Sequence, residues 1–293
     1  MKPARFDYAD PTTLGEVIAL LRQHDGEAKL LAGGQSLMPM LSMRLARPGL
    51  LIDVNRIPGL DYIRETDGVL AIGTMARKRA VEDSDLVARR NPLVRAATLL
   101  VGHQQIRNRG TVGGSMAQAD PAAEYPALAV ALDADLRATG PGGERTIRAA
   151  DFFVTFLTTA LEPAEVLTEV RFPVLPARTG WSVLEVARRH GDFAIAGAVT
   201  TLTLDGGGRV GAARIVLFGV GSTPLRARQA EDRLVGQVPG EKLFAEAAAA
   251  VDQAIDEPMS DVHATAEYRR HVAQVLTRRA LAESATRARG EVL

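Results

Sequence analysis

The sequence predicts an α+β protein, and the order of its strand-like and helix-like segments carries this prediction. Apolar segments over 181–188, 195–204 and 210–218 are typical of strands, and Asp205-Gly206-Gly207-Gly208 is typical of a hairpin turn between the last two. From about Ala227 onward the chain carries long runs of good helix formers. Strands followed by a separate group of helices are characteristic of the α+β class.

The N-terminal segments predict a helix, a strand and a glycine turn, followed by a second helix and strand. Thr12 or Thr13 can cap the first helix, which has Glu16 in its first turn. The apolar face of this helix consists of Leu14, Val17, Ile18 and Leu21. The elements expected next are a strand over 28–32, a helix over 37–45 and a strand over 50–54.

The middle of the chain predicts strands and helices joined by short turns. Asn91 and Pro92 form a good cap and first-turn pair for one of these helices. The segment 106–115 is turn-rich. Helices are expected over 78–90, 92–101 and 127–133, and strands over 69–73, 134–138, 145–148 and 166–172.

Length and turn residues divide the chain into two parts. A chain of 293 residues is long enough for about two domains. The segment 173–180 contains Pro and Gly and is the preferred boundary. A further glycine pair, Gly219 and Gly221, predicts a bend before a helix that begins near Leu225, because Pro224 argues against a dinucleotide-binding turn.

Composition excludes several classes of function. Lys and Arg total 35 and Asp and Glu total 35, and this balance argues against nucleic acid or an anionic membrane as the main partner. The chain has no cysteine, so it can hold no iron–sulfur cluster through its own thiolates and use no cysteine nucleophile. We see no secretory signal and no apolar run of about 18 residues. We therefore expect a cytoplasmic protein without an integral membrane segment.

Two glycine-containing segments are candidate anion sites: Gly33-Gly34-Gln35-Ser36 and Thr111-Val112-Gly113-Gly114-Ser115. Glycine lets the backbone approach a ligand, and successive N–H groups form a concave anion site. Such turns also arise by chance in a chain with 27 glycines, and neither segment fits the P-loop or Rossmann pattern. Together, the two segments indicate a diphosphate held between two subdomains.

Three motifs together resemble the FAD-binding medium subunit of molybdenum hydroxylases. They are AGGQS over 32–36, QIRNRGTVGGS over 105–115 and RRHGDFA over 188–194. This family includes bacterial carbon monoxide dehydrogenase, nicotine and caffeine dehydrogenases, and the flavin part of xanthine dehydrogenase. The likeness runs the whole length of the chain. Each motif alone is weak, whereas their combination is specific.

The resemblance implies a two-subdomain FAD-binding domain of the vanillyl-alcohol-oxidase or PCMH type over 1–176, with subdomains of about 1–57 and 58–176. A C-terminal α+β domain of the medium-subunit type is implied over 177–293. FAD is the implied cofactor, with its diphosphate on the two glycine segments. The residues implied to bind it are Ala32, Gly33, Gly34, Gln35, Ser36, Leu37, Val101, Gly102, Thr111, Gly113, Gly114, Ser115, Glu124, Leu167, Asp192 and Phe193.

Several positions depart from the family pattern. Phe193 stands where the carbon monoxide enzyme has Tyr, and Glu185 stands where it has Lys. Ser115 stands where Asn is common, and Glu124 replaces a frequent Asp on a longer arm. The loss of the phenol removes a hydrogen bond near the flavin, and Phe193 with its neighbours is expected to gate one face of the ring.

The resemblance implies an electron-transfer subunit in which the cofactor carries the chemistry. A large molybdenum-cofactor subunit would oxidise the substrate, and a small subunit with two [2Fe–2S] clusters would pass electrons to the FAD, in a dimer of heterotrimers. The acceptor would be NAD⁺, O₂ or a quinone-type molecule. Two alternatives remain open: a stand-alone PCMH-type flavin oxidoreductase and a non-redox nucleotide-binding module.

Other polar residues can be explained either by a functional role or by an ordinary structural one. Asp120 and Glu124 form either an acid/base or metal pair, or favourable charges at the start of a helix over 122–132. Arg107 and Arg109 are either phosphate ligands or solvated or interface charges, and the second interpretation is preferred. The histidines lack a metal-ligand spacing. We therefore expect no metal site and no catalytic acid or base in this chain.

Overall fold

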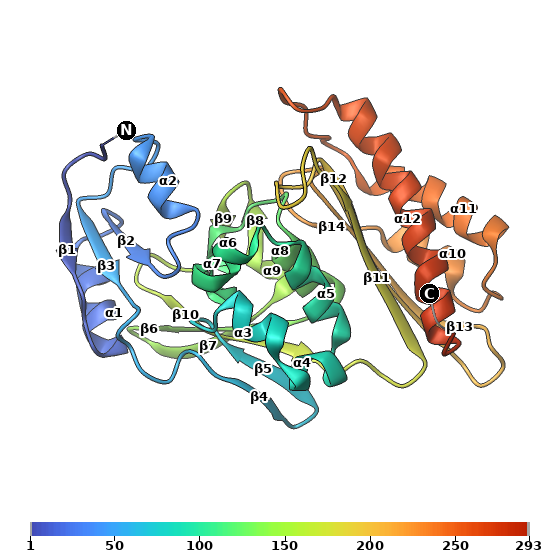
Figure 1. Ribbon diagram of the computed structural model, residues 1–293, viewed down its shortest axis with the longest axis horizontal. Coiled ribbons are helices and arrows are strands. Elements are labelled where there is room, and N and C mark those ends of the chain that lie inside the picture. Colours follow the sequence, from blue (N-terminus) through green and yellow to red (C-terminus); the bar gives the residue numbers. More distant parts are fainter. Residues whose placement is uncertain (1, 292–293) are drawn as a thin grey trace.

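The computed structural model describes residues 2–291 and contains three main β-sheets arranged along the length of the molecule (Figure 1). A small N-terminal sheet lies at one end, a five-stranded sheet lies in the middle and a four-stranded sheet lies at the other end. Helices fill the space between the middle and C-terminal sheets, and further helices cover the outer side of the C-terminal sheet (Figure 1).

The N-terminal sheet has the strand order β1-β3-β2, and its strands are parallel. Its helix α1 (Leu14–Gln23) begins at a capping box, in which the Thr13 side chain accepts from the Glu16 N–H and the Glu16 carboxylate accepts from the Thr13 N–H. Val17 of α1 packs with Ile52 in a smaller core, which also includes Met75 and Val166 of the middle part. The other elements are β1 (Asp7–Ala9), β2 (Ala28–Leu31), α2 (Leu37–Ser42) and β3 (Leu50–Asp53).

The middle sheet has the order β4-β5-β10-β6-β7, and all its pairs are antiparallel. Its strands are β4 (Ile63–Thr66), β5 (Val69–Gly73), β6 (Asp135–Gly140), β7 (Gly143–Arg148) and β10 (Val166–Pro173). A two-stranded hairpin is attached, formed by β8 (Phe153–Thr155) and β9 (Thr158–Thr159). The helices of this part are α3 (Lys78–Asp83), α4 (Asp85–Arg90), α5 (Pro92–Leu100), α6 (Gln104–Arg109), α7 (Val112–Gln118), α8 (Glu124–Ala131) and α9 (Ala149–Phe152).

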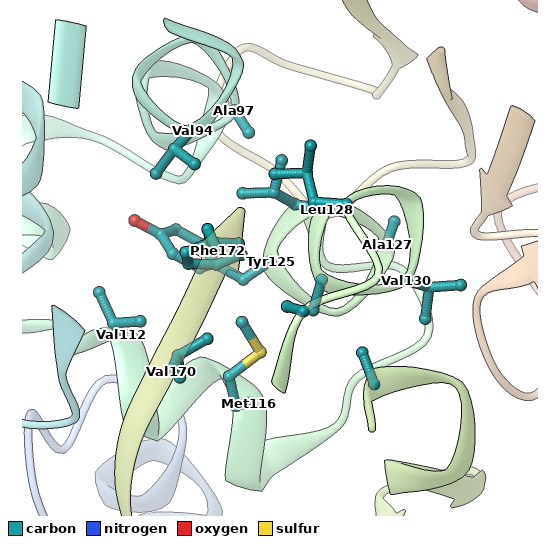
Figure 2. Close-up of a cluster of buried hydrophobic side chains, with 14 of the residues drawn as sticks. Val94, Ala97, Val112, Met116, Tyr125, Ala127, Leu128, Val130, Val170 and Phe172 are labelled. Carbon is teal, nitrogen blue, oxygen red and sulfur yellow. The ribbon is translucent and has the colours of Figure 1, made fainter. Parts of the chain in front are cut away.

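The largest hydrophobic core lies between the middle sheet and its helices. Tyr125 of α8 and Phe172 of β10 lie at its centre, with Met116 and Leu128 around them (Figure 2). Every residue of α8 is buried, because this helix packs against α5, α7 and α9 and against β12 and β13 of the C-terminal sheet. Phe218 of the C-terminal sheet belongs to the same core, so the two parts share buried apolar surface.

The C-terminal part is an antiparallel sheet covered by helices, as the sequence predicts. The sheet has the order β11-β12-β13-β14, formed by β11 (Thr179–Val186), β12 (Ala196–Leu204), β13 (Val210–Phe218) and β14 (Leu225–Arg226). The long helix α12 (Ala266–Ala288) packs on β11 and β12. The remaining helical elements are α10 (Arg228–Leu234), α11 (Glu241–Ala250) and a 3₁₀ turn over Val251–Ala254. The predicted α+β fold class is confirmed.

Some local predictions are wrong. The segment 106–115 is largely helical, because α6 and α7 occupy most of it. The predicted helix over 78–90 is two helices, since the Ser84 hydroxyl accepts from the Val87 N–H and caps a new helix. The helix expected near Leu225 begins at Arg228, because Leu225 pairs with Leu217 at the edge of the sheet. No helix within residues 2–291 is both long and apolar enough to cross a bilayer.

Candidate cofactor site

The first glycine segment forms a turn between β2 and α2 whose backbone donors are free. Gly34 has φ +72°, a conformation that glycine adopts readily. The Gln35 side chain donates to the Gly33 carbonyl oxygen at 2.9 Å and so braces the turn from within. Within residues 2–291, the N–H groups of Gly33, Gly34, Gln35 and Ser36 donate to no protein acceptor. Such a run of donors fits an anionic group.

The first segment packs directly against the end of α6. A Cβ added at Gly33 would lie 2.4 Å from the Arg109 carbonyl oxygen and 2.8 Å from the Gly110 Cα. The Arg77 guanidinium links the same two segments, because it donates to the Arg109 carbonyl oxygen and to Asn55 Oδ1. Asn55 in turn donates to the Ala32 carbonyl oxygen at 2.9 Å. Gly33 is therefore required for contact between two backbones.

The second glycine segment is hydrogen-bonded to the residue that follows β5 in the middle sheet. Its backbone N–H groups already have acceptors within the protein. Thr111 caps α7, and its hydroxyl accepts from the Gly114 N–H at 3.0 Å. The Gly113 N–H donates to the Thr74 carbonyl oxygen at 2.9 Å, and the Ser115 N–H donates to the Thr111 carbonyl oxygen. A Cβ at Gly113 would lie 2.3 Å from that of Thr74. This glycine therefore serves packing against β5, and a ligand can reach the segment mainly at Gly114 and Ser115.

Glu124 lies at the start of α8 and is almost completely buried. Burial raises its pKa to about 7, and the nearby Lys78 ammonium only partly offsets this effect. Lys78 is itself buried, and its pKa is lowered to about 8 by burial. Asp120 does not share this position, because its carboxylate accepts from the Ala122 N–H in the preceding turn. Glu124 is thus a buried titratable group, and a hydrogen bond from its own backbone N–H opposes part of the rise in its pKa.

The predicted ring-end residues lie where the C-terminal part meets the end of α5. Gly102 has φ +54°, and a Cβ at Gly191 would lie 2.9 Å from the Gly102 carbonyl carbon. The 188–194 segment is therefore seated on the 101–103 turn. Phe193 projects from that segment with 58% of its surface exposed. An exposed aromatic ring at this boundary fits a role in covering a bound ring.

Arg107 has neither of the roles that the sequence suggested. Its guanidinium is buried and pairs with Glu82, with 2.7 Å between Nε and Oε2. It also donates to the carbonyl oxygens of Val101 and Gly102. Arg107 therefore holds the 101–102 turn in place and is not a solvated or interface charge. Arg109 is exposed beside the first segment, as expected for a solvated charge.

The structure arranges the predicted residues in two groups, separated by α6. The two glycine segments lie near the Gly110 end. Leu167 lies beside the second segment, because its carbonyl oxygen accepts from the hydroxyl of Thr74, against which Gly113 packs. The turn at Val101 and Gly102 lies at the other end with Asp192 and Phe193. A helix of six residues is about 9 Å long, so the groups suit two parts of an extended ligand.

Sequence reasoning missed three residues of this region, namely Asn55, Arg77 and Lys78. They lie outside the glycine motifs, and only the folded chain brings them beside these motifs. A surface cavity of about 600 Å³ lies elsewhere, against α2 and the start of β2, and contains no predicted site residue. Within residues 2–291, no cluster of His, Cys, Asp or Glu could hold a metal ion.

Comparison with known proteins identifies the family. A family model for the FAD binding domain in molybdopterin dehydrogenase matches residues 4–175, and one for the CO dehydrogenase flavoprotein C-terminal domain matches residues 181–284. The chain is 41% identical to the 6-hydroxypseudooxynicotine dehydrogenase complex subunit alpha of Paenarthrobacter nicotinovorans, over 99% of this chain and 97% of that one.

Carbon monoxide dehydrogenase of Hydrogenophaga pseudoflava is a further relative. Its medium chain is 41% identical over 96% of this chain and 97% of its own length. A solved structure of that enzyme, lacking the Mo-pyranopterin moiety of the molybdenum cofactor, superposes with a TM-score of 0.95, covering 98% of this chain and 99% of that chain. The sequence, the fold and these relatives agree: this chain belongs to the FAD-binding medium subunits of molybdenum hydroxylases.

Proposed function

We propose that FAD lies along α6, with its diphosphate on the first glycine segment and its ring at the turn formed by Val101 and Gly102. The observation that carries this proposal is the run of four backbone N–H groups over 33–36 that have no acceptor among residues 2–291. Anions bind such groups through charge-assisted hydrogen bonds. Ser36 and Ser115 add hydroxyl donors. Glu124, Leu167, Asp192 and Phe193 complete the set of proposed FAD contacts.

The chain serves in this proposal as an electron carrier between other centres. Electrons pass from [2Fe–2S] clusters of a small partner subunit, through FAD held by this chain, to an external acceptor. A large partner subunit holds the molybdenum cofactor and oxidises the substrate. The absence of cysteine supports this division, because thiolates are the usual ligands of iron–sulfur clusters. The proposed assembly is a dimer of heterotrimers.

The domain organisation follows the same proposal. Residues 1–176 form the flavin domain, with subdomains of about 1–57 and 58–176, and residues 177–293 form the C-terminal domain. The core around α1 and β3 is distinct from the largest core and so supports the first subdivision, and Met75 and Val166 of the second subdomain complete it. The protein supplies position and electrostatics, and FAD supplies the redox chemistry.

An absorption spectrum of the purified full chain tests this function. We expect flavin bands after gentle purification, or after addition of FAD followed by removal of unbound cofactor. Co-expression with candidate large and small subunits should give a complex that contains molybdenum and iron. A chain that takes up no FAD would overturn the proposal. A flavoprotein that oxidises a small substrate without any partner would favour the stand-alone oxidoreductase instead.

A further inference from the structure

One buried cation near the glycine segments has no partner within the protein. Lys78 is the first residue of α3, and only 6% of its surface is exposed. Within residues 2–291, its ammonium donates no hydrogen bond and forms no ion pair with a carboxylate. It lies instead over the face of the Tyr125 ring, with Nζ 5.4 Å from the ring centroid. A buried ammonium without an acceptor is costly, so this position favours an anion.

Arg77, the preceding residue, is a cation whose partners all come from the protein. Its guanidinium donates to the Arg109 carbonyl oxygen and to Asn55 Oδ1. Glu82, one turn further along α3, is a carboxylate that is already paired with two arginines. The charged groups next to Lys78 in the sequence therefore bind other residues and leave its ammonium without a partner.

Glu124 influences Lys78 through its negative charge but does not compensate it. This charge raises the pKa of Lys78, whereas burial has the larger effect and lowers that pKa to about 8. Burial also raises the pKa of Glu124 to about 7, so the charge of Glu124 is itself disfavoured in this environment. The chain alone therefore does not stabilise a full positive charge on Lys78.

The ammonium of Lys78 lies beside the first glycine segment. A Cβ added at Gly110 would lie 3.6 Å from Lys78 Nζ and 3.7 Å from Gln35 Cγ, so the two side chains flank the same point of the backbone. Gln35 belongs to the run of four residues whose N–H groups have no acceptor within residues 2–291. Nζ is not one of the completely enclosed polar atoms that lack a partner, so a small anionic group can reach it. A positive side chain and free backbone donors therefore gather in one place.

We propose that Lys78 is a cofactor-binding residue, whose ammonium donates a charge-assisted hydrogen bond to the diphosphate of FAD next to the first glycine segment. This role rests on the proposed function and adds a contact from outside the glycine motifs. Phosphate oxygens are strong acceptors for lysine, and a site with little water strengthens the attraction. The backbone N–H groups over 33–36 orient the diphosphate, and Lys78 supplies a compensating charge.

The variant Lys78→Met tests this role, because Met has an unbranched side chain that needs no partner when it is buried. In the full chain without FAD, we expect the urea midpoint of Lys78→Met to equal or exceed that of the wild type. The FAD Kd, measured by flavin fluorescence, should nevertheless rise by about ten- to a hundredfold, as for a lost hydrogen bond between charged groups. A residue that only supports the fold would lower the midpoint and the affinity together. Either that joint loss or an unchanged Kd would overturn the proposal.

Lys29→Met is the matched control. Lys29 is an exposed lysine on β2, the strand that leads into the first glycine segment. Its replacement removes the same charge and should leave the FAD Kd within about twofold of the wild-type value. Lys78→Gln should show the same separation of stability and affinity if Lys78→Met does not fold. Equal rises in the Kd of Lys29→Met and Lys78→Met would indicate a general effect of net charge and overturn the direct contact.

Phosphorus NMR of bound FAD identifies the part of the cofactor that Lys78 contacts. At saturating FAD, we expect the diphosphate resonances to differ between the wild type and Lys78→Met. The reduction potential of the flavin should be the same in both chains. Unchanged resonances together with a lower potential in Lys78→Met would place the ammonium at the flavin ring and overturn the contact with the diphosphate.

Inorganic pyrophosphate separates a failure of this proposal from a failure of the proposed function. A ligand that binds only the folded chain raises the urea midpoint. At low ionic strength, pyrophosphate should raise the midpoint of the wild type and have a much smaller effect on Lys78→Met. If the wild type takes up no FAD but shows this difference, the proposed function fails and Lys78 remains an anion-binding residue. FAD uptake by the wild type with an equal Kd in Lys78→Met would reject the role of Lys78 and leave the proposed function intact.

Discussion

The two glycine segments look alike in sequence but differ in what they leave available to a ligand. Over 33–36 the backbone N–H groups have no acceptor within residues 2–291, and the turn is braced by the Gln35 side chain. Over 113–115 each N–H group is already bonded, to Thr74 or to Thr111. The first segment can therefore supply backbone donors, whereas the second supplies a rigid support and the Ser115 hydroxyl.

Glycine occupies these positions for two different physical reasons. Gly33 and Gly113 are glycine because another part of the chain occupies the space of a Cβ. Gly34 is glycine because of its backbone conformation. At Gly114 a Cβ would meet only the Thr111 hydroxyl, at 2.8 Å, among the atoms closest to it. A Gly-Gly pair in a sequence thus does not identify which backbone touches the ligand.

The largest effect is expected for Gly33→Ala. The new methyl group would press on the Arg109 backbone at 2.4 Å and force the two segments apart. We expect unfolding to become easier by about 1–3 kcal/mol, the usual cost of overpacking, together with loss of most bound FAD. Urea unfolding and flavin content measure these effects. Gly15→Ala, in open space on α1, is the control and should be neutral or slightly stabilising. Retention of full stability and FAD content in Gly33→Ala would contradict this close contact.

A pair of variants compares the two segments directly. Gly34→Ala puts a side chain at φ +72°, which costs about 1–2 kcal/mol and turns the free N–H groups away from their present direction. Gly114→Ala disturbs the Thr111 cap and costs about 1 kcal/mol. The two variants should lose similar amounts of stability. We nevertheless expect a clearly larger rise in the FAD Kd for Gly34→Ala than for Gly114→Ala. Equal rises would show that the second segment also supplies backbone donors.

The smallest effects are expected for the two serines. Ser36 makes no capping hydrogen bond through its side chain, so Ser36→Ala should leave stability within about 0.5 kcal/mol. A lost hydrogen bond to a charged group should raise the FAD Kd by about tenfold at most. Ser115→Ala should have a similar effect, since the hydroxyl is what this segment offers. Isothermal titration calorimetry with FAD measures the Kd of both variants. An unchanged Kd for Ser115→Ala would show that the second segment supports the structure and makes no contact with FAD through this hydroxyl.

Local patterns were reliable where short-range interactions decide the structure. The cap of the first helix at Thr13, the apolar strands of the C-terminal sheet and the hairpin after Leu204 all follow from neighbouring residues. The pattern failed over 106–115, where polar residues and glycines suggest turns. There Arg107 of α6 forms a buried pair with Glu82, and Gly113 of α7 packs against Thr74. Such long-range contacts leave no periodic signal in the sequence.

By itself, the sequence determined the α+β class, the family resemblance and the positions of the glycine segments. Only the tertiary structure decided which of their N–H groups stay free, because the acceptor of the Gly113 N–H is Thr74, which is distant in the sequence, whereas the Gly114 N–H is bonded locally by the Thr111 cap. Hydrogen-bond satisfaction depends on all neighbours in space, and for Gly33 and Gly113 these neighbours come from distant parts of the chain.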